Sequence, residues 1–182
     1  FIAGFSGSRF SAAKDPELGF ATMQAWNDWM FEEWYGPHPT RIIPMALTWL
    51  ADPEKGAAEV RRNAERGVHA VSLPELPHRL GYPSLHSGHW DPILRACEET
   101  DTVVCLHVGS AGLPADLAPD GPEPGLSATL FQAMSLNSCV DWIWSGVALR
   151  FPNIKIAMSE GGIGWVPMLK DRLNFMINKS GH

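Results

Sequence analysis

Short apolar runs alternate with amphipathic stretches along most of the chain, and this alternation constrains the fold more than any other feature. Four apolar runs predict buried strands, over residues 41–47, 68–73, 103–108 and 155–159. Helical spacing predicts helices over residues 53–66, 91–99, 127–149 and 165–178. Strands that alternate with helices are typical of a parallel sheet covered by helices. A doubly wound sheet and a barrel both fit this order of elements.

Several of the expected helices carry recognisable start signals. The tripeptide Asp-Pro-Glu opens an upstream helix at Asp15 and a second helix at Asp52. An aspartate side chain accepts hydrogen bonds from the first N–H groups of a helix, and proline suits the first turn. Asp91, which precedes Pro92, is expected to be an N-cap in the same way. The Gly- and Pro-rich segment 109–125 is predicted to be a lid or binding loop, because long loops inside compact domains usually have such a role.

Composition narrows the functional classes. The formal net charge is −6 and no Lys- or Arg-rich stripe occurs, which argues against a nucleic-acid partner. No apolar run approaches the roughly 18 residues that a membrane-spanning helix needs, so no membrane partner is expected. The three cysteines match no zinc or redox spacing and are expected to be free thiols, which favours a cytoplasmic setting. No GxGxxG fingerprint occurs, so a dinucleotide-dependent oxidoreductase is disfavoured.

Polar residues stand at the ends of predicted strands, where ligands bind in α/β folds. His107 lies at the end of the third apolar run and is followed by Gly109 and Ser110. A histidine on an apolar strand is either a satisfied core residue or a metal ligand or general base. The small residues after it would let a small molecule approach, which favours a functional role. Glu75, which follows the second strand, is expected to be a solvated strand end, with the minor alternative that it faces the site.

Glu160 follows the fourth apolar run directly. A carboxylate there is either a structural partner of a buried donor or of the next helix, or an acid/base or metal-binding group. The loop between the second strand and the next helix adds His86, His89 and Trp90. Two histidines three residues apart could hold a metal or line a pocket, although exposed loop histidines are the simpler interpretation.

Four stretches together resemble the amidohydrolase-related family that includes aminocarboxymuconate-semialdehyde decarboxylase. They are Leu85-His-Ser-Gly-His-Trp-Asp-Pro92, Cys105-Leu-His-Val-Gly-Ser110, Phe151-Pro-Asn-Ile-Lys-Ile-Ala157 and Ser159-Glu-Gly-Gly-Ile-Gly-Trp165. The resemblance covers the chain from about Asp15 onward and is most specific between His107 and Arg172.

The resemblance implies a (β/α)8 TIM barrel that holds a divalent metal, usually zinc. Family members bind the metal through an N-terminal His-x-His pair, a histidine on strand five and a late aspartate, and a strand-six histidine assists catalysis. His107 matches the strand-five ligand, and Glu160 stands at the position of the strand-six histidine. No His-x-His pair occurs in these residues, and the late aspartate would lie beyond His182. A complete barrel needs about 250 residues, so residues 1–182 are expected to form a single, incomplete barrel domain with its central strands and without its N- and C-terminal strands.

The resulting hypothesis is a metal-dependent hydrolase or non-oxidative decarboxylase of a small carboxylate-bearing or cyclic substrate. His107 is expected to be a catalytic residue and a metal ligand, and Glu160 is expected to be catalytic. The expected substrate-binding residues are His86, His89, Trp90 and Ser110. The alternative is a metal-free or non-catalytic member of the same barrel family that binds a small molecule. Whether the protein forms a homo-oligomer stays open.

Overall fold

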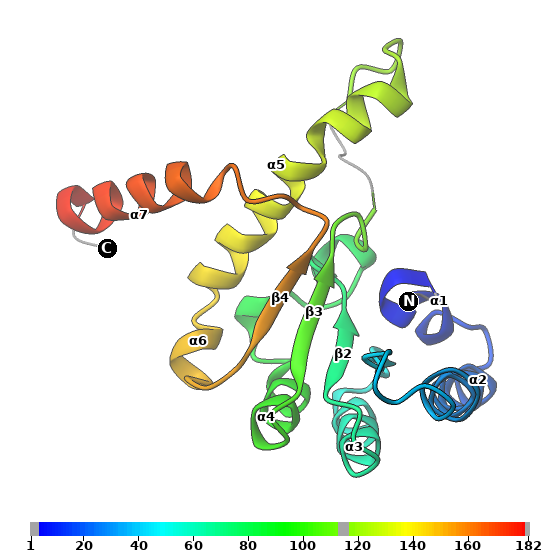
Figure 1. Cartoon of the computed structure of the whole chain (residues 1–182). Coiled ribbons are helices and arrows are strands. Elements are labelled where there is room, and N and C mark those ends of the chain that lie inside the picture. The colour runs from blue at the N-terminus through cyan, green and yellow to red at the C-terminus, as the bar shows by residue number, and fades with distance from the viewer. Residues whose placement is uncertain (1–3, 113–116, 181–182) are drawn as a thin grey trace.

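Four parallel strands form the centre of the molecule in the computed structural model, which describes residues 4–112 and 117–180. The strands are β1 (Ala46–Leu47), β2 (Ala70–Leu73), β3 (Val103–His107) and β4 (Ile156–Ser159). They lie in the order β1-β2-β3-β4, so each strand pairs with its neighbour along the chain. All four predicted strands therefore occur, and their sequential order is that of a barrel wall (Figure 1).

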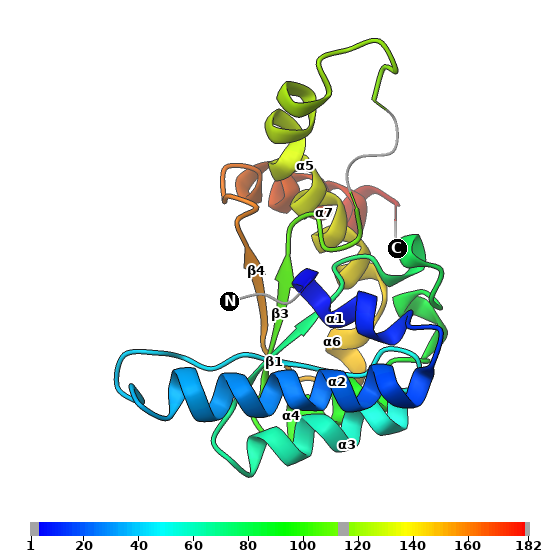
Figure 2. The same ribbon diagram turned by 90° about the vertical axis from the view of Figure 1, so that its right-hand side faces the viewer.

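Helices follow each strand and cover the sheet. Those of the described residues are α1 (Gly4–Ser11), α2 (Pro16–Trp29), α3 (Pro53–Ala64), α4 (Asp91–Glu99), α5 (Glu123–Trp144), α6 (Val147–Arg150) and α7 (Val166–Ser180). Three short turns of other helix types are η1 (Met30–Tyr35), η2 (Pro77–Leu80) and η3 (Leu85–Ser87). Figure 2 shows α2 and α3 side by side below the sheet, while the start of α5 extends beyond the tips of the strands. No helix within the described ranges is both long and apolar enough to cross a membrane.

The first strand is shorter than the apolar run that predicts it. The predicted strand over residues 41–47 is apolar after Arg41, but only Ala46 and Leu47 pair with the sheet. Within the described residues β1 has β2 as its single partner strand, and Pro44 has no N–H group to donate. The prediction for residues 41–45 was therefore wrong because a proline interrupts a strand that is paired on one side.

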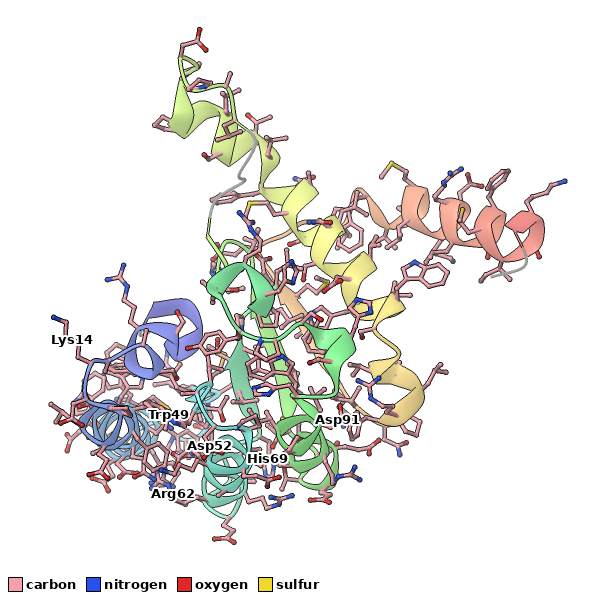
Figure 3. The ribbon with its side chains drawn as sticks, turned by 180° about the vertical axis from the view of Figure 1, so that it is seen from behind. Lys14, Trp49, Asp52, Arg62, His69 and Asp91 are labelled. Carbon is pink, nitrogen blue, oxygen red and sulfur yellow. The ribbon has the colours of Figure 1, made fainter. Side chains whose placement is uncertain are left out.

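Two of the three predicted N-caps are confirmed. Asp15 Oδ1 accepts hydrogen bonds from the first N–H groups of α2, and Asp52 Oδ1 does the same for α3. The prediction for Asp91 was wrong, because Asp91 is the first residue of α4 and Trp90 occupies the cap position. The Asp91 carboxylate instead forms an ion pair with Arg150 at 3.2 Å. Figure 3 labels Asp52 and Asp91, which lie at the starts of their helices.

The helix predicted over residues 127–149 is displaced and interrupted. α5 begins earlier, at Glu123, and ends at Trp144. Gly146 then adopts a left-handed conformation with φ of +72°, which stops the helix, and α6 continues after it. The loop predicted over residues 109–125 is correspondingly shorter, and its residues 113–116 lie outside the described part of the chain.

Strand β3 has two faces with different surroundings. Val104 and Leu106 are 0% and 1% exposed and belong to the main hydrophobic core with Trp142 and Phe151. Cys105 and His107 alternate with them and are only partly buried, so they lie on the opposite face. His107 is therefore on the face of the sheet that a barrel turns inward.

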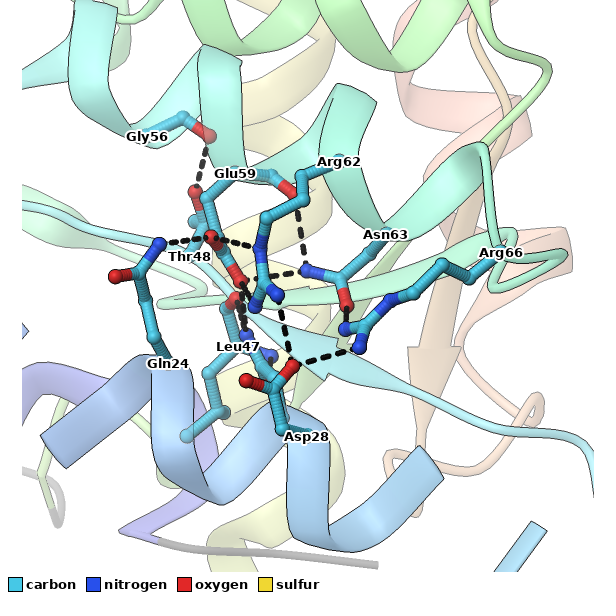
Figure 4. A network of polar contacts seen from close by, with 10 residues as sticks. Gln24, Asp28, Leu47, Thr48, Gly56, Glu59, Arg62, Asn63 and Arg66 are labelled. Carbon is cyan, nitrogen blue, oxygen red and sulfur yellow. Dashed lines mark hydrogen bonds and ion pairs between the residues drawn. The ribbon is translucent and has the colours of Figure 1, made fainter. Parts of the chain in front are cut away.

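A buried polar network joins α2, α3 and β1 (Figure 4). Its centre is the carboxylate of Glu59, which is 1% exposed and accepts hydrogen bonds from Asn27, Asn63 and Arg62. Asn27 also bonds both backbone groups of Leu47, at 2.8 and 2.9 Å. The network fixes the upstream helix to Leu47, the last residue of the first strand.

Candidate active site

His107 and Glu160 meet at the C-terminal edge of the sheet. His107 is the last residue of β3 and pairs in register with Ser159, the last residue of β4. Glu160 follows directly, and its Oε2 lies 3.4 Å from His107 Nε2. The histidine side chain is 13% exposed and the glutamate side chain 57%. The structure thus brings together the two residues that the sequence predicts to be catalytic, one shielded and one accessible.

The backbone determines which nitrogen of His107 faces Glu160. Nδ1 lies 2.7 Å from the carbonyl oxygen of Val108. A carbonyl oxygen only accepts hydrogen bonds, so Nδ1 carries the proton in this contact. In the neutral ring Nε2 then holds the lone pair, and in the protonated ring Nε2–H points to the carboxylate. The neutral ring suits Nε2 to accept a proton or to bind a metal, and the protonated ring suits it to donate a proton.

Glu160 has an unusual backbone conformation. Its φ of +65° is in the left-handed region, which residues with a side chain adopt at a cost. The residues after it hold the chain in this shape, since Trp165 Nε1 donates to the carbonyl oxygen of Gly161 at 2.9 Å. Local strain of this kind is concentrated at functional sites, which supports a role for Glu160 beyond that of a helix neighbour.

Glu75 is a third acidic residue at the strand ends, and the expectation for it was wrong. It was expected to be solvated, yet it is 1% exposed. Its Oε1 accepts the N–H of Gly109 at 2.8 Å, and the N–H of Ala111 also donates to the carboxylate. Burial raises the pKa of Glu75, and the two backbone hydrogen bonds and the charges of Arg79 and His107 oppose that rise. The apolar flanks of Glu75, in Leu73-Pro-Glu-Leu-Pro77, are the signal that could have indicated burial.

Ser110 lies beside Glu75. Its hydroxyl oxygen accepts the N–H of Glu75 at 3.0 Å, and the residue is 7% exposed. The side chain that the sequence predicts to bind substrate therefore joins the turn after β3 to the end of β2.

The loop residues predicted to bind substrate have contacts of their own. His86 Nε2 lies 2.9 Å from Asp141 Oδ1 on α5. Trp90 is 2% exposed, belongs to the main core, and donates through Nε1 to the carbonyl oxygen of Pro83. The His89 ring packs edge to face against Trp90, with ring centroids 5.0 Å apart. Their contacts tie the loop to α5 and to the core.

The donor groups at the site suit a divalent metal in kind but are too few. An imidazole and a carboxylate are both ordinary ligands, and a histidine whose second nitrogen donates to a carbonyl is typical of metal sites. A protein metal site needs at least three such ligands. Across residues 4–112 and 117–180, no group of three His, Cys, Asp or Glu side chains could hold a metal ion. The described residues alone therefore do not make a metal site.

Fold and site together define a class: a portion of a parallel barrel with polar groups at the carboxyl ends of adjacent strands. The family model described as "Amidohydrolase" matches residues 5–181. The chain belongs to this amidohydrolase family, whose members are TIM barrels. The resemblance stated on four short motifs is confirmed, and so is the incomplete barrel. No curated protein sequence matches the chain.

Several solved structures share the fold. An amidohydrolase from Mycobacterium avium subsp. paratuberculosis is 26% identical with a TM-score of 0.65, over 92% of this chain and 45% of the other. A 5-carboxyvanillate decarboxylase from Novosphingobium aromaticivorans, solved with bound manganese, is 22% identical with a TM-score of 0.69, over 94% and 48%. A 2,6-dihydroxybenzoate decarboxylase from Rhizobium is 19% identical with a TM-score of 0.66, over 89% and 51%. The chain thus spans about half the length of these structures.

Proposed function

We propose that this chain carries part of the active site of a hydrolase or non-oxidative decarboxylase that acts on a small carboxylate-bearing or cyclic substrate. The observation that carries the proposal is the 3.4 Å approach of His107 Nε2 to Glu160 Oε2 at the strand ends. Membership of the amidohydrolase family supports it. Two structures of the same fold are named as decarboxylases of carboxylated aromatic compounds, which favours substrates of that class.

The pair can move a proton in either reaction. In a decarboxylation, a protonated His107 or Glu160 would donate its proton to the carbon that loses carbon dioxide. In a hydrolysis, the pair would accept a proton from the attacking water and return one to the leaving group. The partly buried histidine is held by Val108, while the exposed glutamate can exchange protons with solvent. This difference makes His107 the group that touches the substrate and Glu160 its proton partner.

The proposal includes a divalent metal, zinc or manganese, with His107 as one ligand. Because Nδ1 donates to Val108, the metal would occupy Nε2, and Glu160 would then be the group of the pair that moves the proton. Because the described residues offer only two suitable donors, the remaining ligands would have to come from outside them. The bound manganese of the 5-carboxyvanillate decarboxylase supports a divalent ion in this fold. When bound, such an ion would polarise a substrate oxygen or activate water.

The proposal also assigns substrate contacts to residues near the pair. Ser110 lies three residues beyond His107 and is held in place by Glu75, so it is the predicted binding residue best placed near the pair. His86 and His89 stand on a loop anchored to α5 and to Trp90, from which they could reach a substrate only beside the strand ends. The three cysteines are free, which supports the proposed cytoplasmic setting.

The full-length protein tests the proposal directly. It would be assayed for carbon dioxide release from 2,6-dihydroxybenzoate and 5-carboxyvanillate and for hydrolysis of small lactones, with metal content measured in parallel. His107→Ala and Glu160→Gln should each lower kcat about 10²- to 10⁴-fold, the range for lost acid–base catalysis. Arg61→Ala, on the outer face of α3, is the matched control and should leave kcat unchanged. Turnover that survives His107→Ala would refute the proposal.

The alternative is a metal-free or non-catalytic member of the family that binds a small molecule. Glu160 motivates it, because it stands where the family resemblance places a histidine. A purified full-length protein that contains no metal, turns over a substrate after chelation and still requires His107 would establish the metal-free version. Binding of the same compounds without turnover would establish the non-catalytic one.

A further inference from the structure

Glu75 is a buried carboxylate that the proposed reaction does not use. We propose that it is a positioning residue for His107, which acts by holding the turn that follows β3. The inference rests on the proposed function for its catalytic consequence, but its structural part does not depend on the reaction.

Glu75 connects three separate parts of the fold. Its carboxylate accepts N–H groups from Gly109 and Ala111, in the turn after β3. Its own carbonyl oxygen accepts Ser138 Oγ and Trp142 Nε1 from α5, each at 3.1 Å. Since Glu75 itself follows β2, this one residue joins β2, the turn after β3 and α5.

The turn that Glu75 holds controls the His107 side chain. The turn begins at His107, whose carbonyl oxygen accepts the N–H of Ser110 at 3.0 Å. The oxygen that orients the imidazole belongs to Val108, inside the same turn. A shift of Gly109 therefore moves the Val108 carbonyl and rotates the ring of His107 away from Glu160. A displacement of about 1 Å at a catalytic group is enough to cost about 100-fold in rate.

The chemistry of the side chain explains why an acid occupies this position. The turn presents two N–H donors, and a carboxylate offers an acceptor oxygen to each of them. A glutamine has a single acceptor oxygen and replaces the other by an NH₂ group, so it offers these two donors fewer lone pairs. A buried charge is costly unless it is fully hydrogen-bonded, so a neutral residue would suffice if the position served packing alone.

Glu75→Gln in the full-length protein is the test, with Glu59→Gln as the matched control. Both glutamates are 1% exposed and accept several hydrogen bonds, but Glu59 lies in the network between α2 and α3. Carbon dioxide release from 5-carboxyvanillate and 2,6-dihydroxybenzoate would give kcat and KM. The ¹³Cε1–H signal of His107, assigned by its loss in His107→Ala, would report the ring position. Glu75→Asp, which keeps the charge but shortens the side chain, is the second variant if Glu75→Gln does not fold.

We expect Glu75→Gln to lower kcat about 10- to 100-fold with KM unchanged and to shift the His107 signal. Glu59→Gln should change neither. If the wild-type protein is active and Glu75→Gln matches Glu59→Gln in kcat and in the His107 signal, the inference is wrong and the proposed function stands. If the wild-type protein is inactive on these compounds, the His107 signal decides alone: a shift specific to the Glu75 variants supports the inference, and an unchanged signal overturns it.

Discussion

Removal of the Glu59 carboxylate should destabilise the fold more than any exposed ion pair in it. The carboxylate accepts hydrogen bonds from Gln24, Asn27, Asn63 and twice from Arg62, at 2.7 to 2.9 Å. Glu59→Ala would leave these donors around a cavity in a site that is 1% exposed. The network in Figure 4 would lose the group on which its bonds converge.

The structure limits the size of the effect. Breaking a buried ion pair by removing one partner costs about 3–5 kcal/mol. The lower end is expected here, because Arg62 is 33% exposed and keeps its ion pair with Asp28. Asn27 also keeps its bond to the carbonyl oxygen of Leu47. A loss of about 3 kcal/mol corresponds to a decrease in Tm of roughly 6–12 °C for a domain of this size.

Chemical denaturation followed by tryptophan fluorescence would measure the loss. Glu99→Ala is the matched control, since Glu99 pairs with Arg61 at 2.8 Å but the two side chains are 50% and 42% exposed. Exposed pairs of this kind contribute about 0–1 kcal/mol. If Glu59→Ala costs no more free energy of unfolding than Glu99→Ala, the buried network does not stabilise the fold.

Two further predictions concern the stability of the fold at low pH and the packing of the turn after Glu160. Burial raises the pKa of Glu59, but hydrogen bonds from Arg62, Gln24 and Asn27 together lower it below its usual value of 4.5. As pH falls, the unfolded chain therefore binds the proton before the folded chain does. The stability that the Glu59 carboxylate contributes is full above about pH 4.5 and is lost as pH falls through the lower pKa of the folded state. Denaturation at several pH values should show that Glu59→Gln loses less stability in acid than the wild-type protein. Gly161→Ala would drive a methyl group into Ser135 on α5 and should cost about 1–3 kcal/mol in unfolding experiments, whereas Gly125→Ala has open space and should be neutral or stabilising.

The elements of the fold were largely predictable because parallel strands are continuous apolar runs, even though Ile156 and Ala157 of β4 are exposed here. β2, β3 and β4 lie within the runs that predict them. The errors have local causes that the apolar pattern does not reveal. Pro44 shortens the first strand, and Gly146 divides the predicted helix into α5 and α6. Asp91 forms an ion pair with Arg150 instead of capping α4. Start signals at Asp15 and Asp52 were reliable because the side chain bonds its own helix.

The sequence could predict which residues of the candidate site meet through the order of the strands. It could not predict which side chains are buried by contacts between distant parts of the chain. His107 and Glu160 end neighbouring parallel strands, so their approach follows from the order of the sheet. The contact of His86 with Asp141 joins residues that are 55 positions apart, and no local pattern contains it. The burial of Trp90 likewise results from packing against Trp142 and other core residues.

The two strand-end glutamates show why a carboxylate must be judged by what covers it. Glu75 follows β2 and Glu160 follows β4, and in sequence each precedes an apolar or small residue. Ser138 Oγ and Trp142 Nε1 on α5 donate hydrogen bonds to the backbone carbonyl oxygen of Glu75, so α5 encloses this residue. The turn after β3 donates N–H groups to the Glu75 carboxylate. Glu160 remains 57% exposed beside His107. An enclosed carboxylate with fixed donors can hold a neighbour in place but cannot exchange protons readily, whereas an exposed one beside an imidazole can. We therefore propose a division of work between them, in which Glu75 orients His107 and Glu160 exchanges protons with it.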